Sequence, residues 1–297
     1  MALLVAVLIL AWGLFWLTNQ PFFKYKTIQN LEINGDLIKK NETIAKLTAQ
    51  VVKKDLEQIL LVGSFYASRK EIVQLVQAGK WQEAANFSAA AFKENDGIDR
   101  IAFFDITGTS MGNVPLQSQL IGQNFSYRDW YRGVTANFKP YVSEVFVRAT
   151  RPAFNVVGLS FPVIDGRGVP IGILLFTLKT DTFLKWLNEL KFSESTLTFI
   201  VDQRGHVVAH PNIAPQEEIV DYSSRPEVRK AISGQSGTEI TVNNTGTVSS
   251  FEPVPGYRWG VISKISISEA AKFGLIKGSG AQVEQGLFKR LFNGHSD

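Results

Sequence analysis

Three short segments of this chain share one pattern, and the pattern restricts the fold more than any other feature does. Each consists of a hydrophobic strand, a turn that opens with Asp and closes with Gly, and a second strand. The turns lie at 105–108, 165–168 and 202–205. The Asp side chain bonds the backbone amides that follow it, and Gly adopts the positive φ that closes the turn. The sequence therefore predicts three hairpins of one design, and so antiparallel sheets.

The hairpins fall into two related modules, at about 97–180 and 195–264. The helical segment TDTFLKWLNELK joins them, and each module ends in a hydrophobic strand, GILLFTL or YRWGVISKI. Upstream, apolar residues in the segment 25–66 recur at steps of three and four residues, which predicts a long amphipathic helix. A shorter helix is expected around 81–93. The predicted fold class is α+β with antiparallel sheets.

The first eighteen residues, MALLVAVLILAWGLFWLT, are uncharged and apolar. At about 1.5 Å per residue, such a helix nearly crosses a hydrocarbon core of about 30 Å. No small-residue cleavage site follows, so we expect an uncleaved membrane anchor. Lys24 and Lys26 follow the span and no basic residue precedes it, which by the positive-inside rule argues for the opposite topology. Either the topology is unusual or the true N-terminus, with its basic residues, is missing, and we favour truncation.

Composition disfavours several classes of function. The chain has 297 residues, a formal net charge of +4 and no cysteine, which excludes disulfides, thiol catalysis and Cys-based metal sites. Its basic residues are scattered, whereas nucleic-acid binding requires a concentrated patch. The sequence contains no P-loop and no Gly-x-Ser-x-Gly elbow. We expect neither an enzyme nor a cofactor, and no nucleic-acid partner.

The stretch YRDWYRGVTANFKPYVSEVF, at 127–146, gathers aromatic rings and arginines ahead of an alternating strand. Two interpretations are open. Trp130 and Tyr131 cap the sheet while Arg128 is a surface charge, or the three side chains line a pocket. A guanidinium matches a carboxylate bidentately, and the indole and phenol add donors in a dry site.

Several motifs together resemble a double Cache domain, the extracytoplasmic sensor of bacterial chemoreceptors, histidine kinases and cyclic-dinucleotide enzymes. The resemblance covers roughly residues 25–270. After the anchor, the long helix and the Arg-x-Trp-Tyr cluster, the segments that carry it are YVSEVF (141–146), LSFPVIDGRGVPIG (159–172), HVVAHP (206–211), AISGQSGT (231–238) and YRWGVI (257–262). It implies a long N-terminal helix and two PAS-like modules with antiparallel sheets, the membrane-distal one holding a small ligand.

In the amino-acid-binding branch of that family, the Arg-x-Trp-Tyr cluster grips the ligand carboxylate, and two acidic residues hold its ammonium. Here the acidic positions are occupied by Arg148 and Thr177, and an upstream Tyr position by Gln123. A buried ammonium without a counter-charge is strongly disfavoured, so the resemblance implies a small organic acid. Arg148 either joins the site or is solvated. The expected ligand-binding set is Arg128, Trp130, Tyr131, Phe146, Arg148 and Thr177.

His206 and His210 lie four apart on a predicted strand, about 13 Å from each other on one face, so a metal pair is not expected. The alternatives to a sensor are an anchored periplasmic hydrolase using one of these histidines and a structural envelope protein. The expected domains are the anchor 1–18, the helices 25–94, a membrane-distal ligand-binding module with its linking helix 95–194, a membrane-proximal module 195–267 and a tail 268–297.

These features together predict a single-pass protein of the inner membrane with its sensor body in the periplasm or outside the cell. The expected partners are a small carboxylate ligand, the membrane, a second copy of the chain and a downstream kinase, cyclase or chemotaxis module. Ligand-induced closure of the distal module would shift the long helix at a dimer interface.

Overall fold

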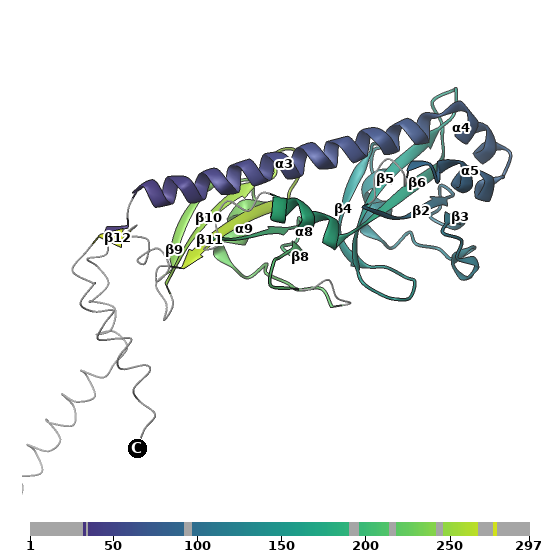
Figure 1. Ribbon diagram of the computed structural model, residues 1–297. Coiled ribbons are helices and arrows are strands. Elements are labelled where there is room, and N and C mark those ends of the chain that lie inside the picture. The colour runs from purple at the N-terminus through teal and green to yellow at the C-terminus, as the bar shows by residue number, and fades with distance from the viewer. Residues whose placement is uncertain are drawn as a thin grey trace, which may run out of the picture. The chain divides into compact units, whose positions relative to one another are not determined.

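The computed structural model describes residues 32–33, 35–91, 97–189, 196–213, 218–241, 246–266 and 276–277 (Figure 1). The larger of two compact units is formed by Lys40–Glu239 and Ser249–Ile265. In the smaller unit, β1 (Glu32–Ile33) pairs antiparallel with β12 (Ile276–Lys277). The predicted anchor, 1–18, lies outside the described residues. None of the helices among the described residues combines the length and the apolar character needed to cross a membrane.

The predicted long helix is α3, Gly35–Ser68, with 34 residues. Its buried apolar residues keep the steps of three and four that the sequence shows, and they include Leu37, Ile44, Val52, Leu56 and Ile59. Gly63 lies inside this helix, where glycine lowers stability relative to alanine. A Cβ at Gly63 would come within 2.1 Å of the Phe161 ring. The missing side chain therefore allows α3 to lie directly against the strand that carries Phe161.

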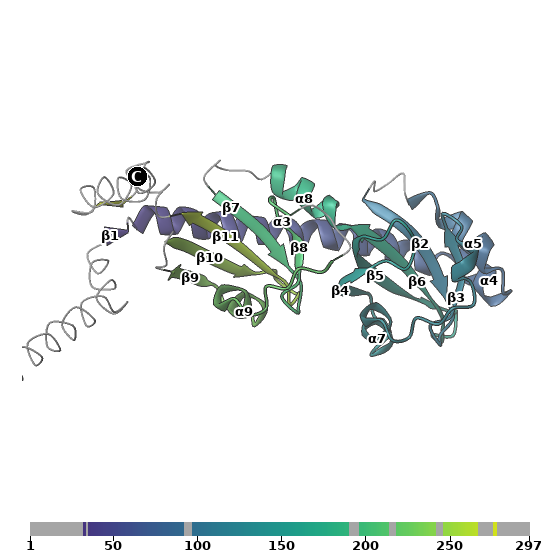
Figure 2. The same cartoon turned by 90° about the horizontal axis from the view of Figure 1, so that it is seen from below.

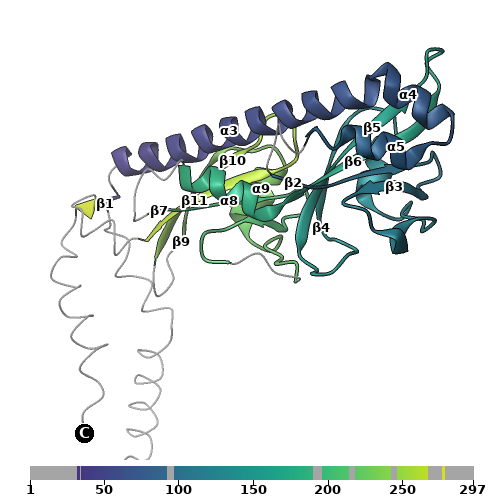
Figure 3. The same cartoon turned by 45° about the vertical axis from the view of Figure 1, so that its right-hand side comes forward.

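Two short helices, α4 (Lys70–Gln77) and α5 (Trp81–Ser88), follow α3 and lie beyond its C-terminal end (Figure 3). Helix α5 corresponds to the first part of the helix predicted around 81–93. It packs closely on the neighbouring strand β3, because a Cβ at Gly112 would come within 2.6 Å of the Trp81 carbonyl oxygen.

The first sheet has five strands in the order β3-β2-β6-β5-β4, with all neighbours antiparallel. Its strands are β2 (Ile98–Phe104), β3 (Ser110–Val114), β4 (Tyr141–Val147), β5 (Asn155–Ile164) and β6 (Pro170–Lys179). Between β3 and β4 lie η2 (Ser118–Leu120) and α7 (Asp129–Thr135). Within the stretch 127–146, residues Asp129–Thr135 are thus helical.

The second sheet follows the first along α3 (Figure 2) and has the order β8-β7-β11-β10-β9. Its strands are β7 (Thr196–Val201), β8 (Val207–Ala209), β9 (Gly237–Thr241), β10 (Thr247–Pro253) and β11 (Gly260–Ser266). Helix α8 (Thr180–Glu189) connects the sheets, and α9 (Pro226–Ile232) packs on the second. The predicted α+β class, with a long helix and two antiparallel modules, is confirmed.

The three predicted Asp-to-Gly turns are present. In each, one oxygen of Asp105, Asp165 or Asp202 accepts hydrogen bonds from the amides two and four residues ahead, at 2.8 or 2.9 Å. The closing glycines have φ of 86°, 83° and 87°. These turns connect the paired strands β2–β3, β5–β6 and β7–β8. Strands β2 and β6 also form one wall of the cavity described below.

Candidate ligand-binding site

The two faces of the first sheet have different neighbours. Along β2, Ile101 and Phe103 enter the large core that also contains apolar residues of α3. Ala102 and Phe104 point to the opposite face and pack with Leu120. This alternation follows from the period of two in a strand. The face turned away from α3 is therefore free to form a separate site beneath η2 and α7.

A cavity of about 60 Å³ lies on that face. Its lining comes from the sheet, from the segment between β3 and α7, from α7 itself and from the loop after β4: Arg100, Ala102, Phe104, Ser110, Leu120, Phe125, Arg128, Trp130, Phe146, Arg148, Ala149, Thr150, Leu175 and Thr177. A water-sized sphere needs roughly 10–15 Å³, so the cavity has room for about four to six non-hydrogen atoms or waters. The size suits a short organic molecule.

Trp130 forms part of the wall and is fixed in place. Its side chain is buried, and its ring centroid lies 4.5 Å from that of Phe104. The hydroxyl of Ser160 donates a hydrogen bond of 2.9 Å to the Trp130 carbonyl oxygen. Tyr131, its neighbour in α7, does not line the cavity, and its hydroxyl donates to the Ile106 carbonyl oxygen at 2.8 Å. Successive helical residues point about 100° apart, so the two rings cannot share one pocket.

Arg128 lies at the start of α7, and its guanidinium is held by neutral groups. The guanidinium carbon is 5.1 Å from the ring centroids of both Tyr127 and Phe146, and Nη2 donates to the Val147 carbonyl oxygen at 3.3 Å. Within the described part of the chain, no carboxylate forms an ion pair with Arg128. Most of its five donors therefore remain for a ligand.

Arg148 has its charge compensated. Its Nη1 donates to both carboxylate oxygens of Asp99, at 2.9 and 2.7 Å, and its Nε donates to the Pro152 carbonyl oxygen at 2.8 Å. The two side chains of the ion pair are only 12% and 8% exposed. Arg148 thus lines the cavity and is not solvated. Asp99 is an acidic group beside the site that the sequence analysis did not identify.

Arg100 also lines the cavity and was missed from the sequence. Its Nη1 donates to the Pro115 carbonyl oxygen at 2.7 Å, and its Nη2 lies 3.5 Å from Thr150 Oγ1. Burial lowers the pKa of Arg100, the charge of Asp99 opposes this effect, and the charge of Arg148 adds to it. A guanidinium keeps its proton in proteins, so Arg100 adds a positive charge to that of Arg128 at the cavity.

Thr177 contributes a hydroxyl to the floor of the cavity. In β6 it stands opposite Arg100 of β2 and Gly158 of β5. The side chain is buried, and its Oγ1 has no hydrogen-bond partner in the part of the chain that the structure describes. Buried hydroxyls nearly always have a partner, so this hydroxyl is available to a water or to a bound molecule in the cavity. Five of the six predicted residues therefore surround one cavity.

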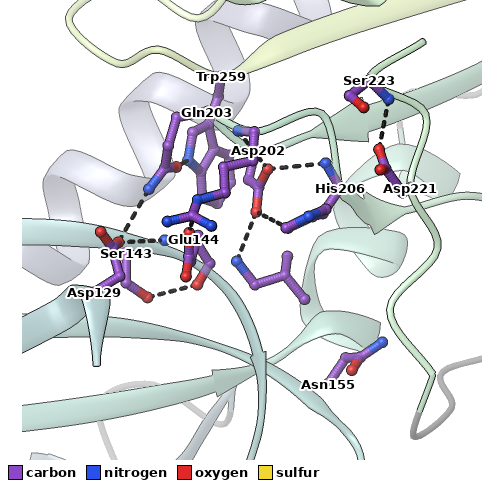
Figure 4. Close-up of polar contacts among 12 residues, drawn as sticks. Asp129, Ser143, Glu144, Asn155, Asp202, Gln203, His206, Asp221, Ser223 and Trp259 are labelled. Atoms are coloured by element: carbon purple, nitrogen blue, oxygen red, sulfur yellow. Dashed lines mark hydrogen bonds and ion pairs between the residues drawn. The ribbon is translucent and has the colours of Figure 1, made fainter. Parts of the chain in front are cut away.

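A second polar cluster lies where β4 meets the β7–β8 turn (Figure 4). Asp202, fully buried, uses its second oxygen to accept the Val145 amide of β4 at 2.8 Å. On the same strand, Glu144 forms an ion pair with Arg204. Burial raises the pKa of Glu144, as does the nearby Asp129 carboxylate, while Arg204 opposes the rise. These contacts join the first sheet to the second.

The two histidines on either side of β8 have different surroundings. His206 Nδ1 lies 3.3 Å from Asp202 Oδ2, not aligned as a hydrogen bond, and the Asp202 carboxylate raises the pKa of His206 against the effect of burial. His210 packs 5.3 Å from the Phe199 ring centroid and accepts the Asn212 amide at Nδ1. Burial lowers the pKa of His210 to about 4. No metal-binding group of three His, Cys, Asp or Glu occurs among the described residues.

Comparison with known proteins gives one family and a consistent fold. The model of the Cache domain matches residues 30–272. The ligand-binding domain of the Pseudomonas aeruginosa PAO1 amino acid chemoreceptor PctB, solved with L-Arg, is 18% identical, with a TM-score of 0.61 over 79% of this chain and 97% of that one. The corresponding domain of PctC, solved with GABA, is 22% identical, with a TM-score of 0.55 over 75% and 96%.

A third structure, the ligand-binding domain of the Pseudomonas fluorescens chemoreceptor CtaA with L-serine, is 17% identical, with a TM-score of 0.61 over 78% and 97% of the two chains. At these identities the likeness shows the fold alone. No curated protein matches. Because the family model matches most of the sequence, the chain belongs to the Cache domain family, in its double form, an extracytoplasmic and ligand-binding sensor domain.

Proposed function

We propose that this chain is the sensing part of a membrane-anchored signalling protein, and that its ligand is a small organic acid bound in the cavity of the first sheet. The main observation in support is that two polar side chains of the cavity keep hydrogen-bonding capacity for a ligand. Among the described residues, Arg128 has no ion-pair partner and the buried Thr177 hydroxyl has no hydrogen-bond partner. A carboxylate satisfies both kinds of group.

The same groups argue against a ligand that carries an ammonium. PctB, CtaA and PctC were solved with L-Arg, L-serine and GABA, all of which combine a carboxylate with an ammonium. A buried ammonium needs a counter-charge. Beside this cavity, Asp99 is already bonded twice to Arg148. The carboxylate end of such ligands fits the cavity, and the ammonium end does not.

The signal would pass from the cavity to α3. Closing of the η2–α7 segment on the ligand would move the first sheet, which contacts α3 at Gly63, and shift this helix against a second copy of the chain. The anchor at 1–18 and a downstream kinase, cyclase or chemotaxis module complete the proposal. We do not propose a hydrolase, since His210 packs against the rings of Phe199 and Tyr222 and its Nδ1 already accepts the Asn212 amide.

A thermal-shift panel tests the function. Small carboxylates at a hundredfold excess over the Kd should stabilise the protein by about 2.7 kcal/mol, or about 5–10 °C in Tm, because they bind only the folded state. Simple amines and ordinary amino acids should give no shift. Arg128→Ala should abolish the shift, whereas Arg132→Ala, an exposed arginine on the same helix, should retain it. A shift with amino acids and none with carboxylates would contradict the proposal.

A further inference from the structure

The cavity has more positive than negative charge. Three guanidiniums line it, those of Arg100, Arg128 and Arg148. Asp99 provides one carboxylate, and both its oxygens are bonded to Arg148. Among the described residues, neither Arg100 nor Arg128 forms an ion pair, and their protein partners are carbonyl oxygens, a hydroxyl and rings. Two positive charges are thus left for a ligand.

The two uncompensated arginines come from different elements and contact different protein groups: Arg100 binds the Pro115 carbonyl and Thr150, and Arg128 binds the Val147 carbonyl. Arg100 belongs to β2, whereas the guanidinium of Arg128 lies against Phe146 of β4. In the sheet order, β6 and β5 separate β2 from β4, while the Arg100 guanidinium reaches Thr150 in the loop after β4. Thr177 lies on β6, between them. Two separate groups of a ligand, rather than one, would meet the two guanidiniums.

We infer that the ligand is a short dicarboxylate, with one carboxylate bound to Arg128, the other to Arg100, and the Thr177 hydroxyl as a donor between them. The inference rests on the proposed function, because it concerns the same cavity. A monocarboxylate would leave one half-buried guanidinium without a counter-charge, which is less favourable than pairing both charges. The cavity of about 60 Å³ limits the connecting chain to a few carbon atoms.

The alternative is that Arg100 has a structural role only, since it holds the Pro115 carbonyl at 2.7 Å. The two roles predict different measurements. A structural arginine, when replaced, weakens binding of every ligand by the same factor or unfolds the protein. An arginine that binds the second carboxylate changes the ratio between dicarboxylate and monocarboxylate affinities and leaves the monocarboxylate affinity unchanged.

Titration calorimetry on the whole chain, at constant ionic strength, measures this ratio. The probes are succinate and glutarate, butyrate as the monocarboxylate, monomethyl succinate as a matched ester, and inorganic phosphate. We expect the better dicarboxylate to bind at least about tenfold more tightly than butyrate or the ester. Arg100→Gln should weaken its binding by about 10- to 100-fold, the range for a lost charge-assisted contact, and leave butyrate within about threefold.

Arg100→Lys is the conservative variant and should retain part of the preference, because the charge remains while the bidentate geometry is lost. Equal affinity for succinate and its monomethyl ester would overturn the inference and leave the proposed function standing. Phosphate as the tightest probe, or an equal loss for both ligand classes in Arg100→Gln, would also overturn it. Failure of every carboxylate to bind the wild type would refute the proposed function itself.

Discussion

Replacement of Asp202 by asparagine tests how much the hydrogen bond between Asp202 and the Val145 amide, which joins the two sheets, contributes to stability. One carboxylate oxygen of Asp202 accepts the amides of Arg204 and His206 within its own turn, at 2.8 and 2.9 Å. The other accepts the Val145 amide of β4, at 2.8 Å. Asparagine keeps the first oxygen and replaces the second with an NH₂ group. That group is a donor, so it faces the Val145 amide with no acceptor between them.

The expected loss follows from these contacts. A hydrogen bond to a charged group contributes about 1.5–3 kcal/mol, and a buried amide left without a partner costs about 1–3 kcal/mol. The two values overlap, since both describe the same bond, and we expect Asp202→Asn to reduce the free energy of unfolding by about 2–4 kcal/mol. Asp105 is the matched control: one oxygen accepts two turn amides and the Thr107 hydroxyl, and its carboxylate makes no bond to any described residue of the second sheet. Asp105→Asn should cost at most about 1 kcal/mol.

Urea unfolding followed by circular dichroism gives both values. Equal slopes with urea concentration in the two variants would show that the difference arises in the native state. Thermal unfolding should agree, at about 2–4 °C per kcal/mol for a chain of this size. If Asp202→Asn costs no more than Asp105→Asn, the Val145 bond contributes nothing to stability and the sheets are joined by other contacts.

Four further outcomes are expected. Gly63→Ala should destabilise the protein by about 1–3 kcal/mol, because the new Cβ overlaps an aromatic ring, whereas Gly166→Ala, with open space around it, should be neutral in the same urea assay. The raised pKa of His206 adds stability below about pH 6.5 that is lost as the pH rises through the raised value, and His206→Asn should remove this slope. His210 has the opposite sign: its contribution is present above about pH 6.5 and is lost as the pH falls towards 4, so His210→Gln should flatten the acid limb. Leu61, 72% exposed on α3, is placed for the proposed dimer, and Leu61→Glu should weaken dimerisation at least about tenfold by ultracentrifugation. A strict monomer in the wild type at every concentration would contradict that geometry.

Local sequence patterns were sufficient to predict much of this fold. The Asp-to-Gly turns and the alternation around them predicted the three hairpins, because turn geometry depends on residues next to each other in the chain. The long helix was predicted for the same reason, from the spacing of its apolar residues. The anchor and most of the tail fall outside the described residues and stay predictions.

The site was only partly predictable, because the register between paired strands decides which of its residues lie side by side. Arg100 and Asp99 lie on a strand that pairs with β6, and a register shift between Ile98 and Arg100 sets which residue faces Thr177. A single sequence does not reveal such a shift. Tyr131 was placed in the site with Trp130, yet the helical turn at α7 directs it elsewhere. A basic residue in an otherwise apolar strand of the predicted binding module was the signal that could have identified Arg100.

Helix α3 contacts both sheets at points far apart along its axis. Asn41 exchanges hydrogen bonds of 2.9 and 2.6 Å with Ser263 of the second sheet, and Gly63 lies against Phe161 of the first. The two points are 22 positions apart (41 to 63), or about 33 Å along the axis. A tilt of about 3° at Gly63 would displace Asn41 by about 1.7 Å, more than either hydrogen bond tolerates. If α3 tilts at Gly63, the second sheet must therefore either move with the helix or lose the two hydrogen bonds between Asn41 and Ser263.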